Sequence, residues 1–340
     1  MKFDFKPLFK EGADPFSDIL GQDRTKFQLM SALLMNRHVL IVGAPGIGKT
    51  TLAKNVARLL PDMEVYACEY NCDLKSPVCP SCRSGVTKGK RKITGEQRFV
   101  RVQGSPDLTV EDLLGDIDPV KALNFGPSSI EAFTPGKIFR ANNGVLFFDE
   151  VNRCPEKIQN SLLQVLEEGV ATMGGYSVDI PSNFIFIATM NPDEVAATEK
   201  LSDVFTDRLD VVHMTYPDAA EIEFEIVRSK GSRLDVEFPD KLLLKTLMFV
   251  RGLRNHKDVQ KKPSVRVSIG LFERAQANAW LKGRKAVSSR DVVDAVLSVL
   301  SHRIELKPAV KYLQSTHDFL VEQLRSFEED TQEFASGDCL

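Results

Sequence analysis

The segment from Gly43 to Thr50, GAPGIGKT, has the glycine spacing and the Lys-Thr ending of a phosphate-binding loop. Glycines let consecutive backbone N–H groups turn toward one point, and the helix that follows adds the positive field of its N-terminus. Lys49 is expected to reach the β- and γ-phosphates of a nucleotide, and Thr50 to ligate Mg²⁺. An ordinary Gly-rich turn is the disfavoured alternative. The residues predicted to bind the nucleotide are Gly43, Ala44, Pro45, Gly46, Ile47, Gly48, Lys49, Thr50 and Thr51.

Two adjacent carboxylates, Asp149 and Glu150, follow the apolar run 145–148. In an enzyme with a phosphate-binding loop, an aspartate at a strand end holds Mg²⁺. The next side chain points the other way, so Glu150 can orient and deprotonate an attacking water. A glutamate here favours hydrolysis over phosphoryl transfer to a substrate. The alternative is a pair of acids that only end a strand.

Four of the six cysteines lie close together, with the spacing Cys68-x3-Cys72-x6-Cys79-x2-Cys82. Four thiolates are sufficient for a tetrahedral Zn²⁺ site, and we predict a structural zinc that orders an insertion over residues 67–98. An iron–sulfur cluster, or reduced cysteines in a mobile insertion, are the open alternatives. The basic stretch 88–92 could meet an acidic partner or nucleic acid. A solvated loop is favoured there because no aromatic residue is interleaved to stack a base.

The segment from Asp149 to Pro155, DEVNRCP, resembles the D-E-[IV]-N-R-x-P form of the MoxR proteins. Together with the phosphate loop, the chain is similar over residues 14–305 to AAA+ ATPases of the branch that contains magnesium chelatase subunit I and MoxR. By this resemblance Asn191, after the run FIFIATM, is sensor 1, whose amide hydrogen-bonds the γ-phosphate and the attacking water. The alternative is an asparagine that starts a turn.

The resemblance also implies that Arg208 is the arginine finger supplied to the nucleotide of a neighbouring subunit. A guanidinium at the transferring phosphoryl group accelerates hydrolysis by about 10³–10⁵ in related systems. The alternative is an ion pair with Asp207 or Asp210 of the same segment. Arg153 and Arg140 compete for the contact across subunits.

Arg266 resembles sensor 2, because it opens a predicted lid helix from which it could contact the γ-phosphate. Arg274, two turns further on, is interpreted as a surface residue. Two further segments mark the branch: a helix-2 insert at about 116–138 and a hairpin over 169–181 before sensor 1. In this branch such loops face a central pore or a partner, and the alternative is two surface hairpins.

The elements that must position these residues follow from the apolar pattern. Short apolar runs typical of strands buried on both faces alternate with amphipathic helices. This alternation predicts an α/β fold with a parallel five-stranded sheet, whose ligands bind beyond the carboxyl ends of the strands. The predicted strands are 38–42, 99–103, 145–148, 184–188 and 211–214. Helical patterns dominate after Pro217, so we predict an AAA+ core over 1–217, a helical lid over 218–305 and a C-terminal helical extension over 306–340.

The composition limits the partners. Lys and Arg number 44 and Asp and Glu number 47, so the net charge of −3 disfavours a strongly basic nucleic-acid coat protein. No apolar run approaches the roughly 18 residues that span a bilayer, and the charged N-terminus lacks the apolar region of a secretory signal. We therefore predict a cytoplasmic protein with no membrane insertion.

These observations predict an ATP hydrolase that uses ATP and Mg²⁺. By resemblance it would form a homo-oligomeric, hexameric ring and remodel a protein partner, often one with a von Willebrand A domain. A nucleic-acid motor of the MCM type, which shares the helix-2 insert, is the alternative. The net charge and the lack of a recognisable DNA-binding domain count against it. The acidic pair opposes a small-molecule kinase, and no N-K-x-D motif for a GTPase is present.

Overall fold

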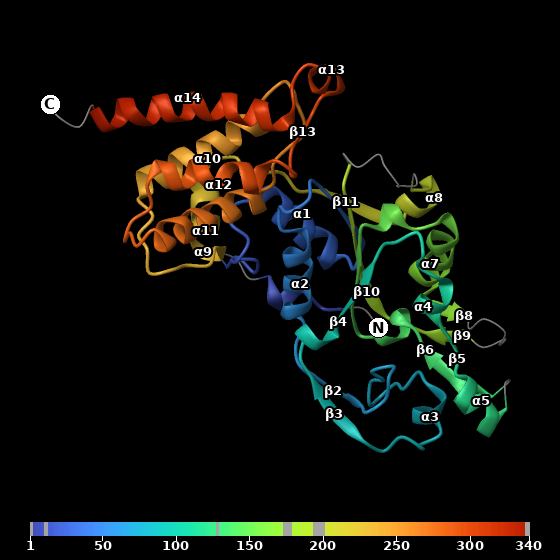
Figure 1. The fold of residues 1–340 in the computed structure, drawn as a ribbon. Coiled ribbons are helices and arrows are strands. Elements are labelled where there is room, and N and C mark those ends of the chain that lie inside the picture. Colours follow the sequence, from blue (N-terminus) through green and yellow to red (C-terminus); the bar gives the residue numbers. More distant parts are fainter. Residues whose placement is uncertain (1–2, 10–12, 127–128, 173–178, 193–200, 337–340) are drawn as a thin grey trace. The chain divides into compact units, whose positions relative to one another are not determined.

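The computed structural model describes residues 3–9, 13–126, 129–172, 179–192 and 201–336. The chain divides into two compact units (Figure 1). The first unit contains residues 1–43 and 48–214, and the second contains residues 215–340 together with the loop segment 44–47. The division at Met214–Thr215 lies close to the boundary predicted after Pro217. No helix in the described ranges is long and apolar enough to cross a membrane.

A five-stranded parallel sheet forms the centre of the first unit, with the strand order β11-β1-β10-β7-β4. The strands are β1 (His38–Val42), β4 (Phe99–Gln103), β7 (Gly144–Asp149), β10 (Phe184–Met190) and β11 (Leu209–His213). The predicted α/β fold and its five strands are confirmed. Because all five strands run in one direction, the segments that follow their carboxyl ends lie along one edge of the sheet.

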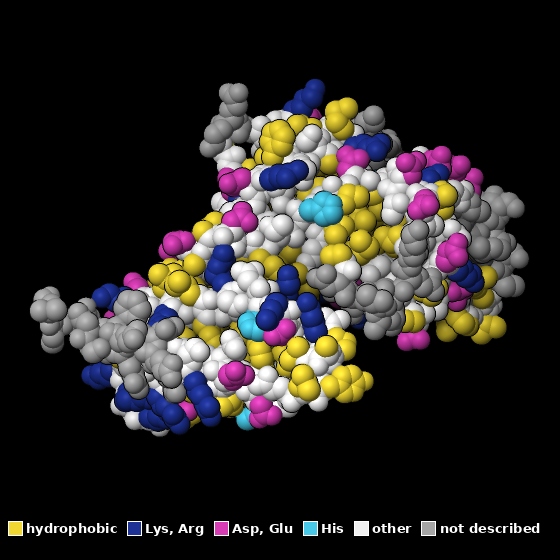
Figure 2. Space-filling model, turned by 90° about the horizontal axis from the view of Figure 1, so that it is seen from above, with side chains coloured by type: hydrophobic (Ala, Val, Ile, Leu, Met, Phe, Trp, Pro, Cys, Tyr) yellow, Lys and Arg dark blue, Asp and Glu magenta, His cyan; other side chains and the backbone are white. Residues whose placement is uncertain are grey.

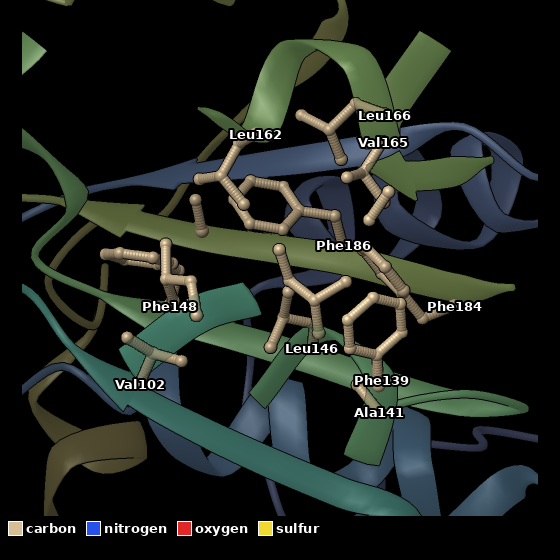
Figure 3. Close-up of a cluster of buried hydrophobic side chains, with 14 of the residues drawn as sticks. Val102, Phe139, Ala141, Leu146, Phe148, Leu162, Val165, Leu166, Phe184 and Phe186 are labelled. Atoms are coloured by element: carbon tan, nitrogen blue, oxygen red, sulfur yellow. The ribbon is translucent and has the colours of Figure 1, made fainter. Parts of the chain in front are cut away.

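Side chains of the sheet alternate between two faces, and both faces are buried in the central strands β1, β10 and β7. On one face, α7 (Glu156–Glu168) packs Leu162, Val165 and Leu166 over aromatic and aliphatic side chains of β7 and β10 (Figure 3). The helices α1 (Asp23–Leu34) and α2 (Lys49–Leu59) contact the strands from the other side. This burial on both sides explains why the three central strands are continuous apolar runs, whereas the edge strands β4 and β11 carry exposed polar residues.

Two small antiparallel pairs lie in the predicted branch-specific segments. β5 (Gly115–Ile117) pairs with β6 (Phe133–Pro135) around α5 (Pro119–Phe125), so the helix-2 insert region is a two-stranded frame that carries a helix. The hairpin before sensor 1 consists of β8 (Val170–Thr172) and β9 (Asp179–Pro181). Its centre, with Gly174 and Gly175, lies outside the described residues.

The cysteine-rich insertion is a β-ribbon in which β2 (Met63–Tyr66) pairs with β3 (Lys90–Ile93). It carries the short helix α3 (Pro80–Arg83). The ribbon begins at Met63, before the predicted start at residue 67. The basic stretch 88–92 is partly strand, where a loop was expected, because cross-strand pairing with β2 orders it.

The second unit is a helical lid, as predicted. Its main helices are α9 (Ala220–Lys230), α10 (Asp240–Asn255), α11 (Val265–Leu281), α12 (Ser289–Leu300) and α14 (Thr316–Ser336). A short antiparallel pair, β12 (Val259–Lys261) with β13 (Glu305–Leu306), was not predicted. Pieces this short carry no recognisable periodicity. The remaining short elements are η1 (Lys6–Leu8), η2 (Glu96–Arg98), α4 (Val110–Leu114), η3 (Ile130–Ala132), α6 (Lys137–Arg140), η4 (Val151–Arg153), α8 (Asp203–Thr206) and α13 (Pro308–Lys311).

Candidate functional site

The predicted phosphate loop joins β1 to α2. Gly46 and Gly48 have φ values of +75° and +103°, which residues with a side chain rarely adopt, so glycine is required at both positions. Gly48 precedes the first residue of α2, Lys49, whose ammonium group donates a hydrogen bond to the Gly43 carbonyl. The glycine-rich turn therefore leads directly into a helix N-terminus, which is the backbone arrangement typical of phosphate-binding loops.

The acidic pair is held by a threonine of the neighbouring strand. Asp149 ends β7, and Glu150 follows it in the left-handed region, with φ of +56°. The buried Thr189 hydroxyl of β10 donates to Asp149 Oδ1 at 2.6 Å and accepts the Glu150 N–H at 2.9 Å. One side chain thus fixes both the carboxylate of Asp149 and the unusual backbone of Glu150. Thr189 was not predicted from the sequence, although its hydroxyl stands out within an otherwise apolar strand.

Strand β4 adds two polar side chains that were also not predicted as site residues. Arg101 Nη2 lies 2.6 Å from Asp149 Oδ2, and Gln103 Nε2 donates to Glu150 Oε2 at 3.1 Å. Arg153 Nε lies 3.2 Å from the same Glu150 oxygen. Both acids are therefore surrounded by donors that orient them. The available signal was the polar alternation of FVRVQ along an edge strand.

Gly104 allows this close approach of β4 to the acidic pair. Its N–H donates to the Asp149 carbonyl at 2.7 Å. A Cβ at this position would lie 2.0 Å from the Glu150 carbonyl oxygen, so no other residue fits without moving the backbone.

Asn191, the predicted sensor 1, directly follows β10. The last residue of that strand, Met190, pairs with Val42 and accepts a hydrogen bond from the Gly43 N–H at 3.1 Å. The start of the phosphate loop and Asn191 are therefore neighbours along the carboxyl edge of the sheet. Both belong to the first unit, as do Asp149 and Glu150.

Arg208, the predicted arginine finger, lies between α8 and β11. Its guanidinium donates to the Val204 carbonyl at 2.7 Å and forms an ion pair with Glu167 of α7. The ion-pair partner of Arg208 is therefore Glu167, and not Asp207 or Asp210 of its own segment; Asp210 pairs with Arg37 at 3.0 Å. The Arg208 side chain is 26% exposed and that of Glu167 is 61% exposed, so the pair lies at the surface.

The two competing arginines occupy different places. Arg153 lies beside Glu150 of its own chain. Arg140 ends α6 before β7 begins, where Nε donates to the Pro135 carbonyl at 3.2 Å. Its Nη2 lies 3.5 Å from Glu69.

Arg266, the predicted sensor 2, is the second residue of α11 and is exposed. Within the second unit, the loop segment 44–47 lies against the start of this helix. A Cβ added to Gly46 would be 3.0 Å from Ser264 Oγ and 3.2 Å from Arg266 Cδ.

The four clustered cysteines converge on one point. Their sulfur atoms all lie within 4.8 Å of one another, and Cys72, Cys79 and Cys82 are buried. The N–H groups of Val78 and Cys79 point at Cys72 Sγ, at 3.4 and 3.3 Å. Four sulfurs around a tetrahedral Zn²⁺ would be about 3.8 Å apart at a Zn–S distance of about 2.3 Å. The donor set therefore fits a thiolate-bound metal.

Asparagines attach the cysteine ribbon to the amino end of the sheet. Asn142 and Asn143, directly before β7, donate from Nδ2 to the carbonyls of Tyr70 and Asn71, each at 3.0 Å. Asn71 in turn donates to the Arg140 carbonyl at 2.9 Å. The cysteine cluster thus lies at the opposite end of the strands from the acidic pair (Figure 1).

Arg98, directly before β4, reinforces this attachment. It donates to the Asn143 carbonyl at 2.6 Å and to the Pro61 carbonyl at 2.7 Å. Burial lowers the pKa of its guanidinium to about 10, which leaves it protonated at neutral pH.

Comparison with family models matches three consecutive parts of the chain. Residues 15–76 match the model described as magnesium chelatase, subunit ChlI. Residues 85–211 match the ATPase family associated with various cellular activities (AAA), and residues 251–322 match the AAA lid domain. The last two cysteines of the cluster fall between the first two matched ranges.

Similar sequences are those of magnesium-chelatase subunits. The magnesium-chelatase subunit ChlI homolog of Methanocaldococcus jannaschii is 30% identical over 331 residues, covering 86% of each chain. The chloroplastic magnesium-chelatase subunit ChlI of Glycine max is 31% identical, covering 86% of this chain and 75% of the relative.

Two solved structures share the fold. A chain of the complex between subunits BchI and BchD of magnesium chelatase superposes with a TM-score of 0.50 at 24% identity, covering 88% of this chain and 98% of that one. A RuvB mutant of Thermotoga maritima superposes with a TM-score of 0.51 at 18% identity, covering 83% and 72%. At these identities the likeness concerns the fold alone.

Proposed function

The chain belongs to the magnesium chelatase ChlI family of AAA ATPases and hydrolyses ATP as a member of it. We propose that it is the motor of an assembly that remodels or activates a protein partner. One observation carries the catalytic part of this proposal. Asp149 and Glu150 are tied by Thr189 to the same sheet edge at which the phosphate loop begins. A strand-end acid pair next to a phosphate loop is what hydrolysis of ATP requires.

The residues take the following roles. Phosphates bind the backbone N–H groups of the loop 43–48 and the N-terminus of α2, with Lys49 on the β- and γ-phosphates. Thr50 and Asp149 offer the oxygen ligands that Mg²⁺ prefers, and an ion held by them would neutralise phosphate charge. Glu150 takes the proton of the attacking water, and Asn191 orients that water.

Arg208 completes the site of a neighbouring subunit. The exposure of its ion pair with Glu167 supports this role, because an exposed pair is worth only about 0–1 kcal/mol. A phosphate could therefore replace Glu167 at small cost. Arg266 contacts the γ-phosphate from the lid, and its place beside Gly46 of the phosphate loop supports that assignment.

We further propose that Cys68, Cys72, Cys79 and Cys82 hold one structural Zn²⁺. The support is the convergence of four sulfurs within 4.8 Å, with N–H groups directed at Cys72 Sγ as second-sphere donors. The cluster lies at the amino end of the sheet, so this metal takes no part in the hydrolysis of ATP.

The assembly we propose is a homo-oligomeric ring, hexameric as in the AAA+ proteins that the chain resembles. The BchI–BchD complex is a complex between two different magnesium chelatase subunits. By analogy, we propose that this chain acts on a protein partner, and that a von Willebrand A domain protein is the first class to test. Figure 2 shows acidic side chains interspersed with basic ones over the face in view, which gives no support to a nucleic-acid track.

Glu150→Gln tests the proposal. This variant keeps the size of the side chain and removes its ability to take a proton. We expect ATP binding to change by less than about twofold, while turnover falls by about 10²–10⁴. Glu168→Gln, an exposed glutamate at the end of α7, is the matched control and should keep full turnover.

The same variant tests the partner. Glu150→Gln held in the ATP state should retain a purified von Willebrand A domain partner longer than the wild type does, and Lys49→Ala should abolish this retention. Stimulation of the wild-type ATPase by DNA, with no effect of the protein partner, would contradict the protein-remodelling proposal.

A further inference from the structure

The lid contains a buried ionic cluster that the roles given above do not use. Glu223 of α9 is fully buried and accepts two hydrogen bonds from the Arg254 guanidinium of α10, at 2.5 and 2.6 Å. The buried Ser268 hydroxyl of α11 donates to the same carboxylate at 2.5 Å. Arg251 Nη1 lies 3.6 Å from Glu223 Oε2. One carboxylate thus joins three helices of the lid.

The cluster also holds the segment by which the chain enters the lid. Arg251 donates to the carbonyls of Pro217 at 2.7 Å and Asp218 at 2.6 Å, and to that of Ala219 at 3.3 Å. The Arg254 guanidinium lies over the Tyr216 ring, 4.7 Å from its centroid. Residues 216–219, the entry segment, are therefore fixed to the end of α10.

The other side of the cluster holds the start of α11. Arg254 Nε donates to the Pro263 carbonyl at 2.7 Å, and Ser268 binds Glu223. Arg266 lies between these two attachment points. Although its own side chain is exposed, the turn of backbone that presents it is anchored on both sides.

Such a cluster fixes the relative positions of the groups it joins more than it stabilises the fold. Burying an ion pair costs desolvation energy that the attraction between the charges often only offsets, so an apolar replacement can be equally stable. A two-pronged arginine–carboxylate contact, however, fixes direction as well as distance. The cluster connects the entry segment to the start of α11 through this contact. It can therefore keep the orientation of one of them fixed relative to the other.

We propose that Glu223 and Arg254 are positioning residues, which make the entry segment 216–219 and the helix start carrying Arg266 one rigid piece. When Arg266 loses its contact with the γ-phosphate, the resulting movement of the α11 start therefore also moves the entry segment, which connects the lid to the rest of the chain. This inference rests on the proposed role of Arg266 as sensor 2.

A double-mutant cycle tests it. Glu223→Gln, Arg266→Ala and the double variant are compared for kcat, KM and affinity for ADP. We expect Glu223→Gln to lower kcat by about tenfold to a hundredfold with ADP affinity unchanged, because a misplaced group loses its effect on the transition state. The double variant should turn over no more slowly than Arg266→Ala alone, because the cluster acts through Arg266.

The matched control is Asp240→Asn, which breaks the ion pair of Arg228 and Asp240 between the same helices α9 and α10. Hydrogen exchange supplies a readout that is independent of turnover. In Arg254→Lys, which keeps the charge and loses the two-pronged contact, exchange should rise together at 216–219 and 264–268. In Asp240→Asn it should stay as in the wild type.

The outcomes separate the two proposals. Full turnover in Arg266→Ala would overturn both the sensor 2 assignment and this inference. A slow Arg266→Ala combined with an additive effect of Glu223→Gln would keep sensor 2 and overturn the positioning role. If Glu223→Gln does not fold, the cycle of Arg254→Lys with Arg266→Ala answers the same question.

Discussion

Asp149 shares its carboxylate between a threonine hydroxyl and the Arg101 guanidinium. A divalent cation that binds Asp149 must therefore compete with the positive charge of Arg101. Because the Arg101 side chain is 51% exposed, solvent screens the pair and its contribution is about 0–1 kcal/mol.

Arg101→Met should thus reduce the Mg²⁺ concentration that gives half-maximal ATPase activity by about two- to fivefold, the equivalent of up to roughly 1 kcal/mol. The measurement is a Mg²⁺ titration at fixed ATP. Arg37→Met, which breaks the similarly exposed pair with Asp210 on the other edge strand, is the control and should leave the midpoint unchanged. A midpoint that rises in Arg101→Met would mean that Arg101 holds Asp149 in its productive position.

His38 gives the protein a dependence of stability on pH. Its Nδ1 accepts the Phe186 N–H at 3.1 Å. Burial lowers the pKa of His38 to about 4, against the opposing effect of a hydrogen bond with the Leu166 backbone. The unfolded chain binds a proton near pH 6.5 and the folded chain only near pH 4. Stability is therefore lost as the pH falls from about 6.5 to about 4.

From this window we expect the free energy of unfolding to fall by about 2 kcal/mol between pH 7 and pH 5 through His38. Urea unfolding at both pH values, with the wild type and His38→Gln, measures it. His38→Gln should show a pH dependence smaller by that amount, and His317→Gln, which removes an exposed histidine, should behave as the wild type. Equal pH dependence in the wild type and His38→Gln would exclude this role.

At the scale of elements, the ribbon β2–β3 is not an independent module. Tyr70, Cys72, Cys79 and Cys82 are part of the same buried cluster as β7, β10 and α7. The carbonyls of Tyr70 and Asn71 receive side chains from the turn before β7. Metal binding by the cysteines should therefore stabilise the whole first unit.

Wild-type protein purified without added zinc should contain one zinc ion per chain by metal analysis, and Cys79→Ser should contain none. It should also lower the free energy of unfolding by about 2–3 kcal/mol. The reason is that a few hydrogen bonds of about 1 kcal/mol each depend on the ordered loop. Cys154→Ser, a buried cysteine outside the cluster, is the control and should keep the zinc. Metal-free protein in which all four thiols are alkylated while folded would refute the zinc proposal.

For the whole molecule, the position of Arg208 predicts that one chain cannot complete its own site. Arg208→Ala should bind ATP as the wild type does and hydrolyse it about 10³-fold more slowly or worse. Mixing it with Glu150→Gln subunits should restore part of the activity. A mixed ring contains sites in which an intact Glu150 faces an intact Arg208 of its neighbour.

The measurement is ATPase activity against the mixing ratio, with co-assembly verified separately. Lys49→Ala mixed with Glu150→Gln is the control, because both defects belong to the same half of the site and cannot complement each other. Activity of the Arg208→Ala mixtures that never exceeds the sum of the two variants would place the finger elsewhere, with Arg153 as the next candidate.

The sequence by itself determined the features encoded by neighbouring residues. The glycine spacing of 43–50, the acids that end the run 145–148 and the four-cysteine spacing each lie within one short segment. Their chemistry depends on backbone turns and side chains that are adjacent in the chain. The three central strands were predictable for a similar reason, because burial on both faces leaves an uninterrupted apolar run.

Only the tertiary structure decided which distant residues support these motifs. Thr189 and Arg101 reach Asp149 through the register of β10 and β4 against β7, and a shift of one residue would turn both away. Glu223 and Arg254 meet because three lid helices cross at one point, which no local pattern encodes. Covalent proximity therefore specifies the reactive groups, whereas long-range packing, which a single sequence does not reveal, selects the side chains that hold them in position.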